Sequence, residues 1–218
     1  MKTGSVEVIC GPMFSGKTEE LIRRLRLARI AKQRIQIFKP VIDNRYENEY
    51  ITSHADQKFL CTPLSETMAI LDQLQDTTRV VGIDEAQFFG EDLIAVCEKL
   101  ANRGLRVIAA GLDQDYLGQP FGPMPQLLAI ADDLLKLKAV CMVCGGEATK
   151  SQRLVQKKDQ VIVGASECYE ARCRHCFDPE HSFVTPEKAG VQKTPQILDS
   201  GFRRNDGLKM EADVAEKR

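Results

Sequence analysis

The chain has 218 residues, of which 43% are hydrophobic, 28% charged and 6% aromatic, and its formal net charge is −1. At about 150 residues per domain, this length indicates one large domain, or one domain with a small appendage. The composition excludes collagen-like, coiled-coil and wholly disordered proteins. The near-neutral charge disfavours a dedicated duplex-DNA binder, because such proteins usually carry a basic surface.

The sequence carries no membrane or export signal. No segment approaches the roughly 18 to 20 consecutive apolar residues of a membrane span. The first five residues lead directly into a strand-like segment and lack the apolar core of a signal peptide. We therefore expect a cytoplasmic protein with no membrane partner. Disulfides are rare in that reducing compartment, so the eight cysteines need another explanation.

Strand and helix patterns alternate along the first two thirds of the chain. Short apolar runs predict strands, and apolar residues at helical spacing predict the helices between them. In chain order these are a strand at residues 5–10, a helix at 17–32, a strand at 34–38, a helix at 64–74, a strand at 80–83, a helix at 92–101, a strand at 106–110, a helical segment at 125–131 and a strand at 135–140. This alternation predicts an α/β fold, in which a parallel sheet is covered by helices on both faces.

The character of the sequence changes near residue 141, where two cysteine-rich segments flank a polar stretch. We expect residues 1–140 to form a nucleotide-binding α/β domain and residues 141–186 a small second domain. Beyond residue 186 large apolar side chains are sparse. Residues 187–218 are therefore expected to form a flexible tail.

The turn after the first predicted strand matches the phosphate-loop pattern GxxxxGK[ST] at every position. It consists of Gly11, Pro12, Met13, Phe14, Ser15, Gly16, Lys17 and Thr18. In such a loop the glycines let backbone N–H groups point at phosphate oxygens, and the helix N-terminus adds its dipole. Lys17 would reach the β- and γ-phosphates of ATP, and the Thr18 hydroxyl would bind Mg²⁺.

Two carboxylates, Asp84 and Glu85, follow the predicted strand at residues 80–83. An acid at this position is typical of the second nucleotide-binding signature of phosphate-loop proteins, which holds Mg²⁺. Because adjacent residues on a strand point to opposite sides, the two acids should have different roles. The second acid would polarise water in an ATPase or deprotonate an acceptor hydroxyl in a kinase. The pair alone does not separate these two cases.

Two C-x₂-C pairs are separated by a long polar segment, and they consist of Cys141, Cys144, Cys173 and Cys176. Four thiolates at this spacing predict a closed, structural Zn²⁺ site. A redox pair or an iron–sulfur site is the alternative, and His175 or His181 could replace one cysteine as a ligand. The other cysteines are predicted to act as small buried hydrophobic residues, and they are Cys10, Cys61, Cys97 and Cys168.

Six basic residues between Arg23 and Arg34 occur without an intervening acid. Such a run could contact nucleic acid. A solvated helix face or a subunit contact is the simpler interpretation.

Five segments of the chain occur in an order that is typical of one enzyme family. They are GPMFSGKT at residues 11–18, DNRY at 43–46, GIDEAQFF at 82–89, GLDQDY with PFG at 111–122, and the two cysteine pairs. By these segments, residues 5–177 resemble a type II thymidine kinase, a member of the zinc-containing bacterial and cytosolic family. The resemblance implies a RecA-like phosphate-loop domain and a small zinc-bound lasso that closes over the nucleoside.

The reaction that this resemblance implies is transfer of the γ-phosphoryl group of ATP to the 5′-hydroxyl of thymidine, with deoxyuridine as a second substrate. The reaction would require Mg²⁺ and would supply the monophosphate for nucleotide salvage and DNA synthesis. Glu85 would be the general base, assisted by Lys17 and Arg45 at the transferring group. The remaining nucleotide and Mg²⁺ contacts would come from the phosphate loop together with Asp43, Asp84 and Gln87.

The resemblance also implies a pocket for the nucleoside, with an aromatic wall for stacking and a few polar groups for the base edge. Its residues would be Met13, Phe88, Leu112, Tyr116, Phe121, Ser151, Gln160, Val161, Ile162, Val163, Gly164 and Tyr169. Tyr116 stands where Phe is common in the family, and Ser151 where Thr is common. These differences leave the preference between thymidine and deoxyuridine open.

The family is usually homotetrameric and is inhibited by thymidine triphosphate, and the resemblance implies both properties here. The competing hypotheses are a phosphate-loop ATPase whose zinc ribbon binds nucleic acid, and a non-enzymatic nucleotide sensor. Neither accounts for Glu85 or for the aromatic wall. We therefore expect thymidine and ATP as substrates and no nucleic-acid partner.

Overall fold

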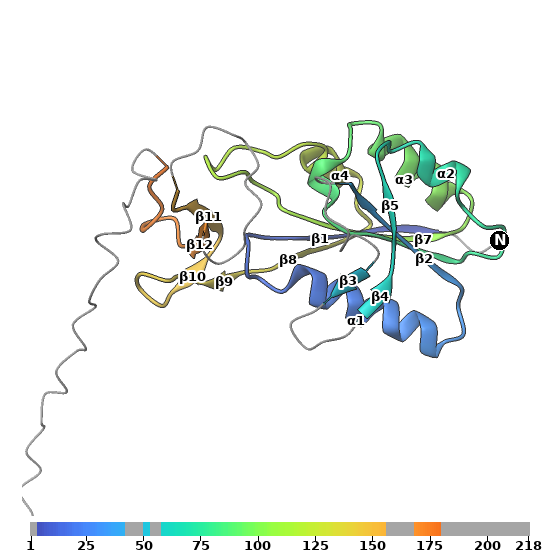
Figure 1. Ribbon diagram of the computed structural model, residues 1–218, viewed down its shortest axis with the longest axis horizontal. Helices are drawn as coiled ribbons and strands as arrows, with labels where there is room; N and C mark the ends of the chain where they lie inside the picture. The colour runs from blue at the N-terminus through green and yellow to red at the C-terminus, as the bar shows by residue number, and fades with distance from the viewer. Residues whose placement is uncertain (1–3, 42–49, 53–57, 156–167, 180–218) are drawn as a thin grey trace, which may run out of the picture. The chain divides into compact units, whose positions relative to one another are not determined.

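The structure is a computed structural model that describes residues 4–41, 50–52, 58–155 and 168–179. These residues lie in one compact unit, built around a six-stranded sheet (Figure 1). The strands of this sheet are β1 (Ser5–Cys10), β2 (Ile35–Pro40), β5 (Thr62–Leu64), β6 (Val80–Ile83), β7 (Arg106–Gly111) and β8 (Asp133–Lys136). Their order is β5-β2-β6-β7-β1-β8, and each neighbouring pair is parallel. The predicted parallel sheet is confirmed.

Helices cover both faces of the sheet, as a purely parallel sheet requires. The first, α1 (Lys17–Ile30), lies on one face, whereas α2 (Ala69–Asp72), α3 (Leu93–Asn102) and α4 (Met124–Ile130) lie on the other (Figure 1). A short 3₁₀ helix, η1 (Ala86–Phe88), follows β6 directly. The predicted helices on both faces are therefore confirmed.

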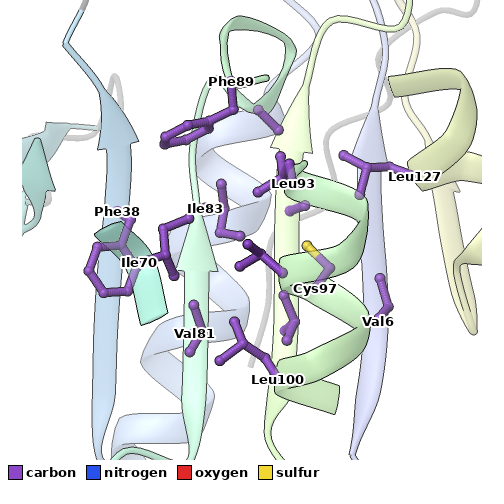
Figure 2. Close-up of a cluster of buried hydrophobic side chains, with 14 of the residues drawn as sticks. Val6, Phe38, Ile70, Val81, Ile83, Phe89, Leu93, Cys97, Leu100 and Leu127 are labelled. Atoms are coloured by element: carbon purple, nitrogen blue, oxygen red, sulfur yellow. The ribbon is translucent and has the colours of Figure 1, made fainter. Parts of the chain in front are cut away.

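The register of the sheet separates two hydrophobic clusters. Phe38, Ile83, Ala109 and Val8 lie side by side on four neighbouring strands, and all four belong to the cluster under α3 that Figure 2 shows. On the opposite face, Ile37 and Ile108 pack with buried residues of α1. The alternation of side chains along each strand thus gives each face its own core.

Helix α1 approaches strand β6 closely at Gly82. A Cβ atom at this position would lie 3.1 Å from Leu25 Cδ1, which is tighter than ordinary van der Waals contact. Glycine in this strand therefore lets the helix that follows the phosphate loop pack directly on the strand that carries the acidic pair.

Three smaller two-stranded sheets accompany the central sheet, and the sequence patterns did not predict them. They are formed by β3 (Tyr50–Thr52) with β4 (Lys58–Leu60), β9 (Ala139–Val140) with β10 (Glu147–Ala148), and β11 (Lys150–Arg153) with β12 (Tyr169–Arg172). All three pairs are antiparallel. The last two pairs belong to the cysteine-rich region.

Two predicted elements differ from the structure. The helix expected at residues 64–74 is helical only at Ala69–Asp72, because the preceding residues extend the edge of the sheet as β5. Pro63 is tolerated there, since an edge strand leaves one side without ladder hydrogen bonds. The single strand expected at residues 135–140 is divided into β8 and β9, which belong to different sheets.

Among the helices that the structure describes, none is both long and apolar enough to cross a membrane.

The cluster under α3 should carry much of the folding stability. Leu100 is fully buried in it, so Leu100→Ala should lower the free energy of unfolding by about 2–5 kcal/mol through lost burial and a residual cavity. The matched control is Leu134→Ala on β8, where the side chain is 49% exposed and the loss should stay below about 1 kcal/mol. Urea unfolding of both variants measures the difference, and equal losses would contradict this assignment of the core.

Candidate functional site

The loop between β1 and α1 has a backbone that few residue types can adopt. Gly11 has φ 148°, and a Cβ atom there would lie 2.5 Å from the carbonyl oxygen of Leu137. Gly16, at the start of α1, is left-handed with φ 82°. The two glycines of the predicted phosphate loop are therefore placed where a side chain would clash or would strain the backbone.

Side chains of the loop fold back onto its own backbone. Ser15 Oγ and Lys17 Nζ each donate a hydrogen bond to the carbonyl oxygen of Pro12, at 2.7 Å. Burial lowers the pKa of Lys17, and the carboxylates of Glu85 and Asp84 oppose this shift. Lys17 therefore lies within electrostatic range of both members of the acidic pair. Phe14 is exposed and has a left-handed φ of 64°.

Asp84 is buried at the end of β6, next to the start of α1. The Thr18 hydroxyl lies 3.4 Å from both carboxylate oxygens of Asp84. Burial raises the pKa of Asp84, and the neighbouring charge of Glu85 raises it further. A carboxyl group that is costly to ionise in the free protein, beside a hydroxyl, forms a site that would favour a bound cation.

Glu85 has a left-handed backbone, with φ 51° and ψ 41°, where the chain turns from β6 into η1. This conformation is uncommon for a residue with a side chain and costs on the order of 1 kcal/mol or more. Glycine would adopt it without that cost. The presence of a carboxylate at a strained position therefore points to a use for the side chain.

Gln87 holds the Glu85 side chain in a fixed position. Its amide Nε2 donates a 2.6 Å hydrogen bond to Glu85 Oε2, and its Oε1 accepts a 2.9 Å hydrogen bond from the backbone N–H of Leu112. Gln87 is buried. The sequence predicted this residue beside the nucleotide, but its pattern gave no indication that the amide connects Glu85 to the segment after β7.

The aromatic residues predicted for the nucleoside pocket come from the segments after β6 and β7. The rings of Phe88 and Phe121 pack edge to face, with centroids 5.4 Å apart and an interplanar angle of 85°. Tyr116 lies in the same loop as Phe121, and its ring stacks against the guanidinium of Arg153. Leu112, which begins this loop, is half-buried.

Two further pocket candidates belong to the cysteine-rich region. Ser151 Oγ accepts a 3.0 Å hydrogen bond from the backbone N–H of Met13, which joins β11 to the phosphate loop. Tyr169 on β12 is buried, and its hydroxyl accepts a 2.9 Å hydrogen bond from Arg153. The other predicted site residues, which lie outside the described residues, are Asp43, Arg45, Gln160, Val161, Ile162, Val163 and Gly164.

The sulfur atoms of Cys141, Cys144, Cys173 and Cys176 all lie within 4.8 Å of one another. The distance from Cys144 Sγ to Cys173 Sγ is 3.7 Å, close to the edge of about 3.8 Å expected for tetrahedral Zn²⁺ with Zn–S bonds of about 2.3 Å. Within the described ranges, this group contains cysteines alone and excludes His175. His181 lies outside the described residues.

The electrostatics of the four-cysteine cluster favour a bound cation. A hydrogen bond with Cys173, followed by burial, raises the pKa of the Cys176 thiol to about 12. Four thiolates at this distance repel one another, and a divalent cation held by all four would remove that repulsion. The donor set and its spacing therefore suit zinc.

The remaining cysteines and the basic run have structural explanations. Cys10, Cys61 and Cys97 are buried, as predicted, and Cys168 is half-buried. Arg24 of α1 pairs with Glu7, Glu20 and Asp133, as follows from the distances of 2.6, 2.9 and 2.7 Å between its guanidinium nitrogens and their carboxylate oxygens. These ion pairs neutralise part of the basic run within the molecule.

The cluster should bind about one zinc ion per chain. Cys173→Ser should lower the zinc content and the melting temperature, because one of four ligands is weakened and the metal stabilises the fold. Cys97→Ala is the matched control, since Cys97 is a buried cysteine under α3, outside the cluster, and its zinc content should be unchanged. Metal analysis of unchelated protein, with thermal unfolding, tests both. Wild-type protein without zinc would contradict the assignment.

The raised pKa of Asp84 should make the stability of the nucleotide-free protein depend on pH. Folded Asp84 keeps its proton over a range in which the unfolded chain has released it, so this group destabilises the fold increasingly as the pH rises. Asp84→Asn should therefore raise the free energy of unfolding at pH 8, on the order of 1 kcal/mol or more, and less at pH 5.

Urea unfolding without Mg²⁺ and with zinc held constant measures this difference. The exposed Asp76→Asn serves as the control and should give a difference that is independent of pH. A gain for Asp84→Asn that is equal at both pH values would contradict the prediction.

Comparisons with known proteins agree with this site. A family model described as thymidine kinase matches residues 4–177. A protein named thymidine kinase from Rhodothermus sp. (strain ITI 518) is 50% identical over 199 residues, which cover 89% of this chain and 93% of the relative. Another from Bdellovibrio bacteriovorus is 53% identical over 177 residues, covering 81% and 87%. A third from Bacteroides thetaiotaomicron is 53% identical over 176 residues, covering 81% and 88%. The chain belongs to the thymidine kinase family.

Proposed function

We propose that this protein transfers the γ-phosphoryl group of ATP to the 5′-hydroxyl of thymidine, with Glu85 as the general base. The observation that carries the proposal is the placement of Glu85. Its carboxylate is held by Gln87 at 2.6 Å, on a left-handed residue that directly follows the strand carrying Asp84. Its charge acts on Lys17 of the phosphate loop. A fixed base beside a phosphate site is the arrangement that a hydroxyl-phosphorylating enzyme needs.

The phosphate loop would bind the triphosphate. Backbone N–H groups of the loop would face the phosphate oxygens, and Lys17 would exchange its hydrogen bond with Pro12 for one to the β- and γ-phosphates. Thr18 and Asp84 would hold Mg²⁺, which neutralises charge on the phosphates when bound. Asp43 and Arg45 complete this part of the proposal, since family membership suggests that they contact the transferring group.

In the proposed step, Glu85 accepts the proton of the 5′-hydroxyl as that oxygen forms a bond to the γ-phosphorus. The bond between the γ-phosphorus and the bridging oxygen breaks, and ADP leaves with the electron pair. Gln87 donates to one carboxylate oxygen of Glu85. The other oxygen can then face the substrate hydroxyl, because the carboxylate is prevented from rotating.

The nucleoside would lie between the aromatic residues and the cysteine-rich region. Phe88 and Phe121 offer faces and edges for stacking on a flat pyrimidine. Met13, Leu112, Tyr116, Ser151 and Tyr169 would complete the described part of the pocket, with the backbone of residues 160–164 at the base edge. Deoxyuridine lacks only the methyl group of thymine, so we propose it as a second, weaker substrate.

Several wider properties belong to the same proposal and rest on family membership. These are a cytoplasmic location, a homotetrameric assembly, inhibition by thymidine triphosphate and a structural zinc ion. The proposed division of the chain also remains as predicted, with a nucleotide-binding domain at 1–140, a zinc-bound lasso at 141–186 and a tail at 187–218. The alternative of an ATPase with a nucleic-acid-binding zinc ribbon loses support from the ion pairs of Arg24.

A panel of nucleosides tests the proposed function. ADP release is followed with ATP and Mg²⁺, and the monophosphate product is identified for thymidine, deoxyuridine, deoxycytidine and purine nucleosides. We expect turnover with thymidine and, at lower efficiency, with deoxyuridine. Single-stranded DNA is added separately. Turnover that depends on DNA and not on a nucleoside would overturn the kinase proposal in favour of the ATPase.

The role of Glu85 predicts the effect of its amide. Glu85→Gln keeps the size of the side chain but cannot accept the proton, so kcat should fall on the order of 10²–10⁴-fold while ATP binding is largely kept. Glu91→Gln is the matched control, because Glu91 is exposed after η1, and its kcat should be unchanged. Steady-state kinetics and ATP titration measure both effects. Unimpaired turnover of Glu85→Gln would eliminate the general-base role.

A further inference from the structure

Strand β11 consists of polar residues that are nevertheless buried. All four of its side chains, Lys150, Ser151, Gln152 and Arg153, belong to buried residues. Burial of polar groups is costly unless each has partners, so such a strand is retained where the partners matter. Ser151 accepts from Met13 of the phosphate loop, and Lys150 donates to Gln114 in the loop after β7. The strand therefore connects separate parts of the site.

Arg153 makes the most extensive of these connections. Its residue is 1% exposed, and its guanidinium carbon lies 3.4 Å from the centroid of the Tyr116 ring, which is the distance of face-to-face stacking. Its Nη2 donates a 2.9 Å hydrogen bond to the Tyr169 hydroxyl, and its guanidinium carbon is 5.5 Å from that ring. Cation–π contacts are strong when the cation is withdrawn from water, as it is here.

The two tyrosines come from separate segments of the chain. Tyr116 belongs to the loop after β7, whereas Tyr169 begins β12 in the cysteine-rich region. We propose that Arg153 is a positioning residue for nucleoside binding, which fixes Tyr116 and Tyr169 as one wall of the base pocket. This inference rests on the proposed function, because it assigns both tyrosines to the pocket.

The position of Arg153 predicts which kinetic constant it controls. A wall that is already ordered loses less side-chain freedom when the nucleoside binds, so Arg153 should lower the KM for thymidine. The phosphoryl-transfer end is fixed by separate contacts, those of Gln87 with Glu85 and Leu112. Removing Arg153 should therefore affect kcat and the KM for ATP far less than the KM for thymidine.

Arg153→Met tests this inference, because methionine keeps much of the volume but removes the charge and the hydrogen-bond donors. We expect the KM for thymidine to rise about tenfold, with kcat within about twofold and the KM for ATP unchanged. Arg153→Lys keeps the charge without the planar group and should give an intermediate KM. Lys150→Met is the matched control on the same strand, since Lys150 contacts Gln114 instead of a tyrosine.

A double-mutant cycle with Tyr169→Phe separates positioning from a general loss of structure. If Arg153 acts through Tyr169, the effects on the KM for thymidine are not additive, and the double variant resembles Arg153→Met. Zinc content and melting temperature are measured for every variant. If Arg153→Met does not fold, the cycle is run with Arg153→Lys.

Three outcomes overturn the inference. The first is a wild-type KM for thymidine in Arg153→Met and Arg153→Lys. The second is an equal rise in Lys150→Met, and the third is a rise accompanied by equal loss of ATP affinity. Failure of the proposed function is distinguishable, because wild-type protein would then show no thymidine-dependent turnover at all.

Discussion

Strand β7 lies between β1 and β6, and this insertion sets the geometry of the whole site. Neighbouring strands are about 4.8 Å apart, so the ends of β1 and β6 are separated by about 10 Å. That separation allows a phosphate group and a cation between the phosphate loop and the acidic pair. Helix α1 crosses back over β6 and brings Thr18 to 3.4 Å from Asp84. The end of β7 then supplies Leu112, whose N–H holds Gln87 and through it Glu85.

The cysteine-rich region depends on a different constraint, because it lacks a large apolar core. Its buried hydrophobic cluster consists of small residues, Ala139, Cys141, Ala148 and Ala171, with Cys173 and Cys176 packed against it. So few apolar atoms stabilise a fold weakly, and a metal held by four thiolates is the usual substitute in small domains. Strands β11 and β12 end at the second cysteine pair, so the cluster also orders the strand that contacts the phosphate loop and Tyr116.

The sequence predicted the elements whose signals are local. The apolar runs of β1, β6 and β7 and the glycines of the phosphate loop each have a direct physical cause, and all lie where expected. Strand β11 could not be predicted in this way, because its four residues are polar and their partners are distant in sequence. The same holds for Gln87 and Arg153, since neither periodicity nor spacing shows which group a buried side chain will contact. The motif located Glu85, but its left-handed backbone appears only in the fold.

The two ends of the site are held by different kinds of contact, and this difference has a consequence for substrate preference. The phosphate end depends on backbone geometry, on Gly11 and Gly16, and on the strained turn at Glu85, which tolerate few substitutions. The base end depends on side chains of β11 and β12 and of the loop after β7, which can be exchanged without moving the sheet. Family differences such as Tyr116 and Ser151 fall at this second end. Nucleoside preference can therefore change by substitution around Arg153 while the machinery for phosphoryl transfer stays the same.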